Sequence, residues 1–171
     1  MWQSAHAIFI SKTICVVLVG FFAALVAINN LLDYDSNFQF VVHVLSMDTT
    51  FEGNQLMHRA ISSDWLHHIA YWFIIVTEAA CGIICLVAAG YMAKGTLGAS
   101  TPLYQRGKAI AVVGLTLGFM LWFGGFMVVG AEWFLMWQSE SWNGQSAAFR
   151  FSSTMLGVLI FLSLPEDMKH A

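Results

Sequence analysis

Four long apolar segments run through this chain of 171 residues and constrain what it can fold into. Two of them, 13–32 and 109–131, contain no charged side chain. The segment 69–93 contains one carboxylate, Glu78, and the segment 147–164 contains only Arg150, whose long side chain can reach back toward water. Since about 20 apolar residues cross the ~30 Å hydrocarbon layer as a helix, the sequence predicts an all-α fold, a single-domain integral membrane bundle of four transmembrane helices.

The composition supports lipid as part of the solvent. Hydrophobic residues make up 58% of the chain and charged residues only 10%, whereas soluble domains carry about 25% charged residues. The net charge of -3 gives no reason to expect nucleic acid as a partner. The three cysteines lie in apolar segments, and this odd number argues against a disulfide framework.

The cations near the ends of the four segments predict the topology. One side of the membrane collects five of them, namely Lys12, Lys94, Arg106, Lys108 and Lys169. The other side holds only Arg59 and Arg150. Because cytoplasmic loops carry an excess of Lys and Arg, we expect an inner-membrane, multi-pass protein with both termini in the cytoplasm.

Two loops, 33–68 and 132–146, then lie on the outer side. In the first, Phe38, Val41, Val42 and Leu45 recur at helical spacing and predict a short amphipathic helix, lying flat on the interface or folded over the mouth of the bundle. The second is rich in tryptophan: Trp133, Trp137 and Trp142. We favour an aromatic belt at the membrane surface for these three residues over a stacking site.

The third segment carries a row of small residues that we call the small-residue seam: Gly107, Ala111, Gly114, Gly118 and Gly125. At 3.6 residues per turn these positions share one face, and small residues allow membrane helices to approach closely. Glu132 follows Gly125 by seven residues and continues this face as a second polar group of the bundle. The pattern predicts a helix contact without deciding whether the partner is in this chain or in another subunit.

Glu78 is the polar group deepest in a predicted span. It lies about ten residues into its segment, roughly 15 Å down at 1.5 Å per residue, and therefore near the membrane centre. A carboxylate there costs about 2.5–3.5 kcal/mol on insertion scales and by default marks a functional or a buried polar site. A structural hydrogen bond and a proton, ion or ligand role are both open for Glu78.

The histidines of the outer side raise the question of a cofactor. A membrane haem usually needs two histidines that face each other, and His43 could meet His67 or His68 only by a particular arrangement of the loops. A haem or metal site on these three histidines, or a bound quinone, are therefore secondary hypotheses, and our main expectation is no cofactor. No phosphate-binding, nucleophile or metalloprotease motif is present, so we assign no catalytic residue and predict a protein that is not an enzyme.

Several stretches together resemble a known family. They are NNLLDY at 29–34 with SNF at 36–38, HVLSMDTTF at 43–51, the segment 114–126 continued by GAEWFLMWQS at 130–139, WNGQ at 142–145 and AFRF at 148–151. They resemble the bacterial family of predicted small integral membrane proteins known as domain of unknown function 2165. The resemblance covers nearly the whole chain and implies four spans in a bacterial inner membrane. It implies no activity and no site residues.

Three functions remain as hypotheses. The leading one is a non-catalytic accessory or scaffold subunit of a larger bacterial inner-membrane complex, such as a respiratory or redox assembly. The second is a small membrane carrier, sensor or ligand-binding protein centred on Glu78. The third is a haem- or quinone-linked electron carrier. The expected partners are membrane lipids together with larger membrane-protein subunits or further copies of the chain.

Overall fold

The computed structural model of the chain describes residues 2–166, with side chains from residue 6 onward. Lys169, one of the cations used for the predicted topology, lies outside the described residues. The elements in chain order are α1 (Trp2–Leu32), α2 (Tyr34–Ser46), the short 3-10 helix η1 (Met57–Arg59), α3 (Asp64–Leu97), α4 (Thr101–Phe119), the π-helix η2 (Met120–Trp133), the 3-10 helix η3 (Met136–Gln138) and α5 (Gln145–Ser163). No strand occurs among the described residues.

The predicted fold class is confirmed, because four helices are long and apolar enough to cross a membrane. They cover His6–Leu32, Asp64–Leu97, Thr101–Trp133 and Gln145–Ser163. At 1.5 Å per residue the 34 residues of α3 extend over about 51 Å, more than the ~30 Å hydrocarbon layer. The first three helices therefore continue beyond the apolar segments 13–32, 69–93 and 109–131 that predicted them.

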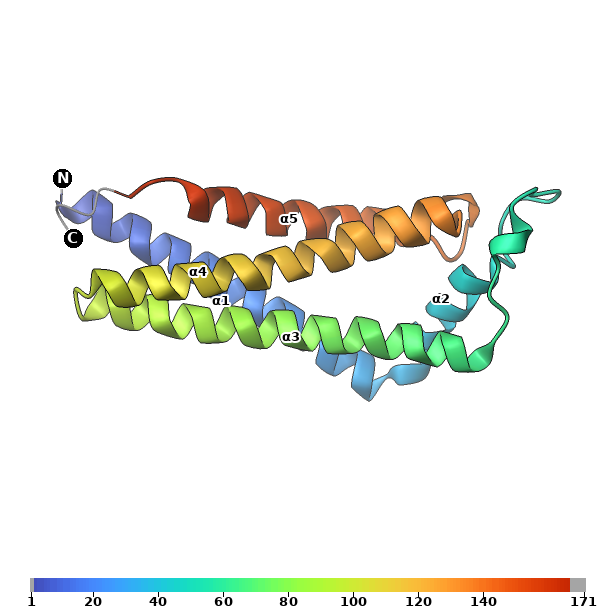
Figure 1. Cartoon of the computed structure of the whole chain (residues 1–171), viewed down its shortest axis with the longest axis horizontal. Helices are drawn as coiled ribbons and strands as arrows, with labels where there is room; N and C mark the ends of the chain where they lie inside the picture. Colours follow the sequence, from blue (N-terminus) through green and yellow to red (C-terminus); the bar gives the residue numbers. More distant parts are fainter. Residues whose placement is uncertain (1, 167–171) are drawn as a thin grey trace.

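The helices form an elongated antiparallel bundle (Figure 1). α3 packs along α4, α1 packs along α3, and α5 packs against α4 and η2. α1 begins and α5 ends near the turn between α3 and α4, and we call this the terminal end of the bundle. α2 and both long loops lie at the opposite end, which we call the loop end.

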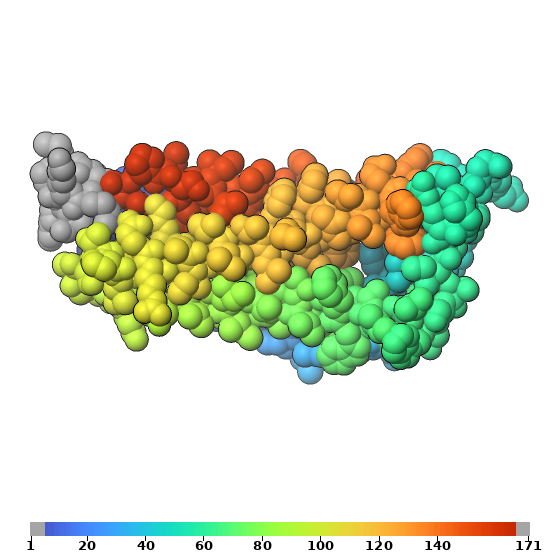
Figure 2. Space-filling view, in the orientation of Figure 1, coloured from blue at the N-terminus to red at the C-terminus, as the bar shows by residue number. Residues whose placement is uncertain are grey.

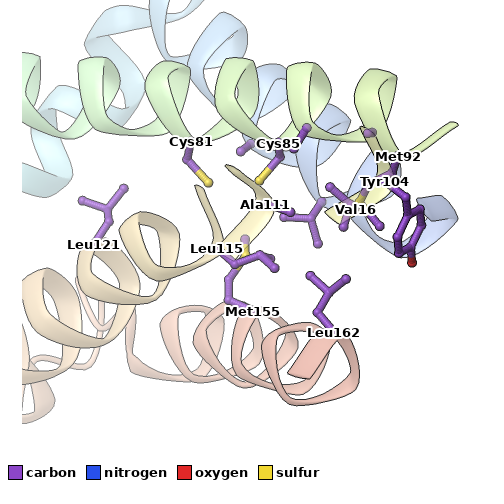
Figure 3. Close-up of a cluster of buried hydrophobic side chains, with 14 of the residues drawn as sticks. Val16, Cys81, Cys85, Met92, Tyr104, Ala111, Leu115, Leu121, Met155 and Leu162 are labelled. Atoms are coloured by element: carbon purple, nitrogen blue, oxygen red, sulfur yellow. The ribbon is translucent and has the colours of Figure 1, made fainter. Parts of the chain in front are cut away.

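The core between the helices combines small residues, cysteines and methionines with larger apolar side chains such as Leu115 and Tyr104 (Figure 3). Cys81 and Cys85 of α3 point toward Ala111 and Leu115 of α4, with Met155 of α5 beside them. Many large apolar side chains instead point outward, such as Leu18, Phe73, Ile83 and Val113, with 59–68% of their surface exposed. So much outward apolar surface is what a lipid solvent requires.

The turns at the terminal end follow from residue chemistry. α3 ends at Leu97 and is capped by Gly98, and Ala99 follows with a φ of 48°. α4 begins after Ser100 with Pro102 in its first turn, where the missing N–H of proline costs no helical hydrogen bond. Pro165 follows the end of α5, which cannot continue through it without losing a backbone hydrogen bond.

The first long loop contains the helix α2, in the place where the sequence predicts an amphipathic helix. Its buried side chains are Phe38, Val41 and Val44, whereas Val42 and Leu45 are only partly buried. Phe38 and Val41 pack with Tyr71 and Ile75 of α3, so this face of α2 meets protein. Whether the opposite face rests on a membrane interface stays a prediction.

The two long loops pack on each other and cover the loop end. The Thr49 hydroxyl donates to Ser139 Oγ at 2.9 Å, and the Phe51 N–H donates to Gln138 Oε1 at 3.1 Å. Arg59 Nη1 donates to the Trp133 carbonyl at 3.2 Å. These contacts join segments far apart in the sequence into one layer beside α2.

Candidate ligand site inside the bundle

Glu78 lies on the inward face of α3 and is only 2% exposed. Its Oε2 accepts a hydrogen bond from Asn30 Nδ2 of α1 at 2.7 Å. The Tyr71 hydroxyl, two helical turns earlier on α3, donates to the Asn30 carbonyl at 3.2 Å. Within the described residues Asn30 is the one hydrogen-bond donor to the carboxyl group, so Oε1 stays open to a further donor.

This polar cluster opens onto a cavity of about 210 Å³ that we call the Glu78 cavity. Its walls come from α1, α2, α3, η2 and α5, and most of them are apolar or aromatic. The aromatic wall residues are Phe40, Tyr71, Trp122, Phe126 and Phe151. A mostly apolar cavity with a few convergent polar groups is the usual form of a small-molecule site.

A second cavity of about 480 Å³ lies next to the first, between α2, α3 and η2, and we call it the apolar groove. Every side chain that lines it is apolar. It shares four wall residues with the Glu78 cavity: Phe40, Val41, Ile74 and Phe126. In Figure 2 the surface is hollowed between the green atoms of α3 and the orange atoms of η2, with bluer atoms of earlier segments behind them.

Asn30 and Tyr71 were not predicted from the sequence as partners of Glu78. Asn30 stands 48 positions before Glu78, directly after Asn29 and near the end of a largely apolar segment. A polar amide at the end of such a segment was the available signal, because burying an unpaired amide is costly. The local pattern could not indicate which helix would satisfy it.

Most of the small-residue seam contacts α3 of the same chain. A Cβ added to Gly107 would lie 2.7 Å from the Ala88 carbonyl oxygen, and one added to Gly114 would lie 2.7 Å from Cys85 Sγ. Ala111 is fully buried between the helices, and a Cβ on Gly118 would lie 3.0 Å from Cys81 Sγ. The seam therefore holds α4 against α3, and these residues are not available to another subunit.

Gly125 and Glu132 do not lie on this buried face, contrary to the prediction. Both are exposed, and a Cβ on Gly125 would meet only Leu121 of its own helix. The reason is the change from α4 to η2 at Met120: in a π-helix the hydrogen bonds run from i to i+5, as from the Phe134 N–H to the Val129 carbonyl. The wider turn shifts each later residue away from the position expected at 3.6 residues per turn.

The three candidate haem or metal histidines are held at separate places. His43 lies 2.7 Å from Asp48 and stacks on Trp142, His67 Nε2 lies 2.7 Å from the Ile61 carbonyl, and His68 Nδ1 lies 2.8 Å from the Tyr34 hydroxyl. Among the described residues no three His, Cys, Asp or Glu side chains are grouped to hold a metal ion. The arrangement gives the haem and metal hypotheses no added support.

The three tryptophans of the second loop all lie at the loop end. Trp133 and Trp137 are about half exposed, at 53% and 43%. The guanidinium of Arg59 lies over the Trp133 ring at 4.5 Å, and Trp142 stacks on the His43 ring at 4.5 Å. Their position at one end of the bundle is compatible with an aromatic belt, which stays a prediction.

At the terminal end, Glu166 joins two helices to the end of α5. It accepts hydrogen bonds from Lys12 Nζ at 2.7 Å and from Lys108 Nζ at 2.9 Å. Lys12, 1% exposed, also donates to the Leu164 carbonyl at 2.7 Å. Burial by itself would raise the pKa of Glu166, but the two lysines outweigh it and lower this pKa. This network joins α1, α4 and the chain after α5 at the terminal end, and it lies apart from the Glu78 cavity.

A family model described as a predicted small integral membrane protein (DUF2165) matches residues 8–165, which confirms the resemblance seen in the sequence. No curated protein and no solved structure matches the chain.

Proposed function

The chain belongs to the family of predicted small integral membrane proteins (DUF2165), and we propose that it binds a small lipid-soluble molecule in the Glu78 cavity. The observation that carries this proposal is a carboxyl group well inside a membrane helix, 2% exposed, that lines a cavity and accepts a hydrogen bond on one of its two oxygens. A group so costly to bury marks a functional site by default.

The shape and chemistry of the site support the same proposal. Typical small-molecule pockets have volumes of about 300–1,000 Å³. The Glu78 cavity is smaller than this range at about 210 Å³, but the neighbouring apolar groove adds a space of about 480 Å³. A ligand with a small polar group and a larger apolar part would use both spaces.

The accessory-subunit hypothesis rested on the small-residue seam, the patterned outer loops and the lack of a catalytic motif, and it loses the first of these supports. Gly107, Gly114 and Gly118 of the seam are occupied by α3 of the same chain. Larger partner subunits, further copies of the chain and a place in a redox complex stay predictions. A quinone remains among the lipid-soluble molecules that the cavity proposal includes.

We further propose that the terminal end faces the cytoplasm of a bacterium. α1 begins and α5 ends there, and the described cations Lys12, Lys94, Arg106 and Lys108 lie in segments at that end. Glu166 neutralises part of this charge, but acidic residues contribute little to the positive-inside bias. The support therefore comes from the asymmetry of Lys and Arg.

The cavity proposal is tested by a thermal-shift screen of the purified full chain. The probes are menadione and farnesol as neutral molecules and octyltrimethylammonium as a cation. A ligand at 100 times its Kd stabilises the folded protein by about 2.7 kcal/mol, so at least one probe should raise the melting temperature saturably. Ala147→Trp places a large ring in the cavity wall and should abolish the shift. If no probe shifts the helical wild type, or if Ala147→Trp shifts equally, the proposal is wrong.

A further inference from the structure

Glu78 has no positively charged partner in the part of the chain that the structure describes. The ion pairs of that part lie at the two ends of the bundle, and none of them includes Glu78. Asn30 satisfies only Oε2. A carboxylate at membrane depth is costly unless a positive charge or further hydrogen bonds accompany it. The site thus offers an ionisable carboxyl group and free space, but no positive group that would stabilise the ionised form.

The aromatic walls of the Glu78 cavity also favour a positively charged ligand. Trp122 and Phe151 stand nearly edge to face, with ring centres 5.7 Å apart, and Phe40 and Phe126 stack with centres 6.2 Å apart. All four rings line the cavity. The faces of aromatic rings attract cations, most strongly in tryptophan, and rings of this kind recognise quaternary ammonium groups.

The apolar groove supplies space for a hydrocarbon group beside this cavity. No charged or hydrogen-bonding side chain lines it, and Phe40 and Phe126 belong to the walls of both spaces. The hollow in Figure 2 lies on the flank of the bundle between α3 and η2, where lipid would surround the helices. A ligand dissolved in the membrane could reach the groove from this side.

From these features we infer that the protein binds a lipid-soluble organic cation. Its positive group sits beside Glu78 and the aromatic rings, and its hydrocarbon part lies in the apolar groove. This inference rests on the proposed function and specifies its ligand class. A negatively charged ligand would be repelled by the ionised carboxylate, and a neutral one would do nothing to stabilise that ionised form, whereas a cation would.

The test compares three probes that share a ten-carbon chain and differ only in the head: decyltrimethylammonium, decanol and decanoate. The full chain is placed in nanodiscs of zwitterionic lipid, and saturable binding is measured with radiolabelled probe against excess unlabelled probe. Empty nanodiscs give the partition background. We expect saturable binding of the cation and little or none of the other two.

Variants assign the binding to the site. Removing one partner of a desolvated charge pair typically costs a factor of roughly 30 or more, so Glu78→Gln should weaken cation binding by at least that factor. Glu132→Gln is the matched control, because Glu132 is an exposed carboxylate outside both cavities, and it should bind like the wild type. Phe151→Leu keeps the carboxylate but removes one ring and should weaken cation binding roughly 2- to 30-fold.

The outcomes separate this inference from the proposed function. If decanol binds to the wild type and to Glu78→Gln equally well, the cavity holds a neutral molecule and the cation inference is wrong while the proposed function stands. If Glu78→Gln fails to fold, as judged by helicity and elution volume, the Phe151→Leu result decides. Cation binding unchanged in Phe151→Leu, or reduced equally in Glu132→Gln, overturns the inference.

Discussion

The close contact between α3 and α4 predicts that a single methyl group added at Gly107 destabilises the bundle. A Cβ added at Gly107 would lie 2.7 Å from both the Ala88 carbonyl oxygen and the Met92 backbone nitrogen. Ordinary van der Waals contact begins at 3.4 Å, and neither backbone atom can rotate away. Gly107→Ala therefore requires the two helices to separate by about 0.7 Å, the difference between these distances.

The size of the expected loss of stability is worked out against a matched control variant in α3. Gly90 has nothing within 4 Å of an added Cβ, so Gly90→Ala changes the helix propensity without a steric clash. The propensity gain, up to ~1 kcal/mol in soluble hosts, is common to both variants and cancels in their difference. What remains is the cost of overpacking, typically about 1–3 kcal/mol. We therefore expect Gly107→Ala to be less stable than Gly90→Ala by that amount, a factor of about 5–150 in the unfolding equilibrium.

The assay is reversible unfolding in mixed micelles, with the free energy of unfolding obtained for wild type, Gly90→Ala and Gly107→Ala under one set of conditions. Helicity before unfolding checks that each variant starts from the folded bundle. Were Gly107→Ala and Gly90→Ala equally stable within about 0.5 kcal/mol, the two helices would not be as closely packed as the argument requires.

Two further predictions concern the terminal end and the topology. Glu166→Gln should lower the free energy of unfolding by on the order of 1.5–3 kcal/mol, because it removes the charge that Lys12 and Lys108 bind. The folded-state pKa of Glu166 lies below its ordinary value of 4.5, so this stabilisation is complete above pH 4.5 and is lost as the pH falls through the folded-state pKa. The melting temperature should therefore fall more between pH 7 and pH 3 in the wild type than in Glu166→Gln. An equal fall in both proteins would contradict this role of Glu166. For the topology, a cysteine in place of Leu97, which is 86% exposed at the terminal end, should react with a membrane-impermeant maleimide only after the cells are opened, whereas Glu52→Cys at the loop end should react in intact cells. The reverse pattern would invert the proposed orientation.

Much of the fold could be predicted from the sequence, because a lipid solvent leaves little choice. Every backbone polar group in the membrane must be satisfied within the segment, so an apolar segment long enough to cross becomes a helix. The same local rule placed Glu78 deep in its helix and put Gly107, Ala111, Gly114 and Gly118 on one face. These features depend only on the spacing of residues along one regular helix.

The prediction that this face continues to Gly125 and Glu132 was wrong, because residue spacing does not reveal a change of helix type. From Met120 onward the helix takes up π-helical hydrogen bonds, and its turns hold more residues. The segment 109–131 is uncharged on both sides of this change and contains no proline, so it gave us no signal of it.

The candidate site was decided only by the tertiary structure. Asn30, Tyr71 and Glu78 converge because α1 packs along α3, and the cavity exists because α2, η2 and α5 leave a space that their side chains do not fill. The sequence determined which groups could not remain unpaired in a membrane, since desolvation acts on each residue separately. Which groups met, and what space remained between them, depended on how four helices pack against one another, and that is a property of the whole chain.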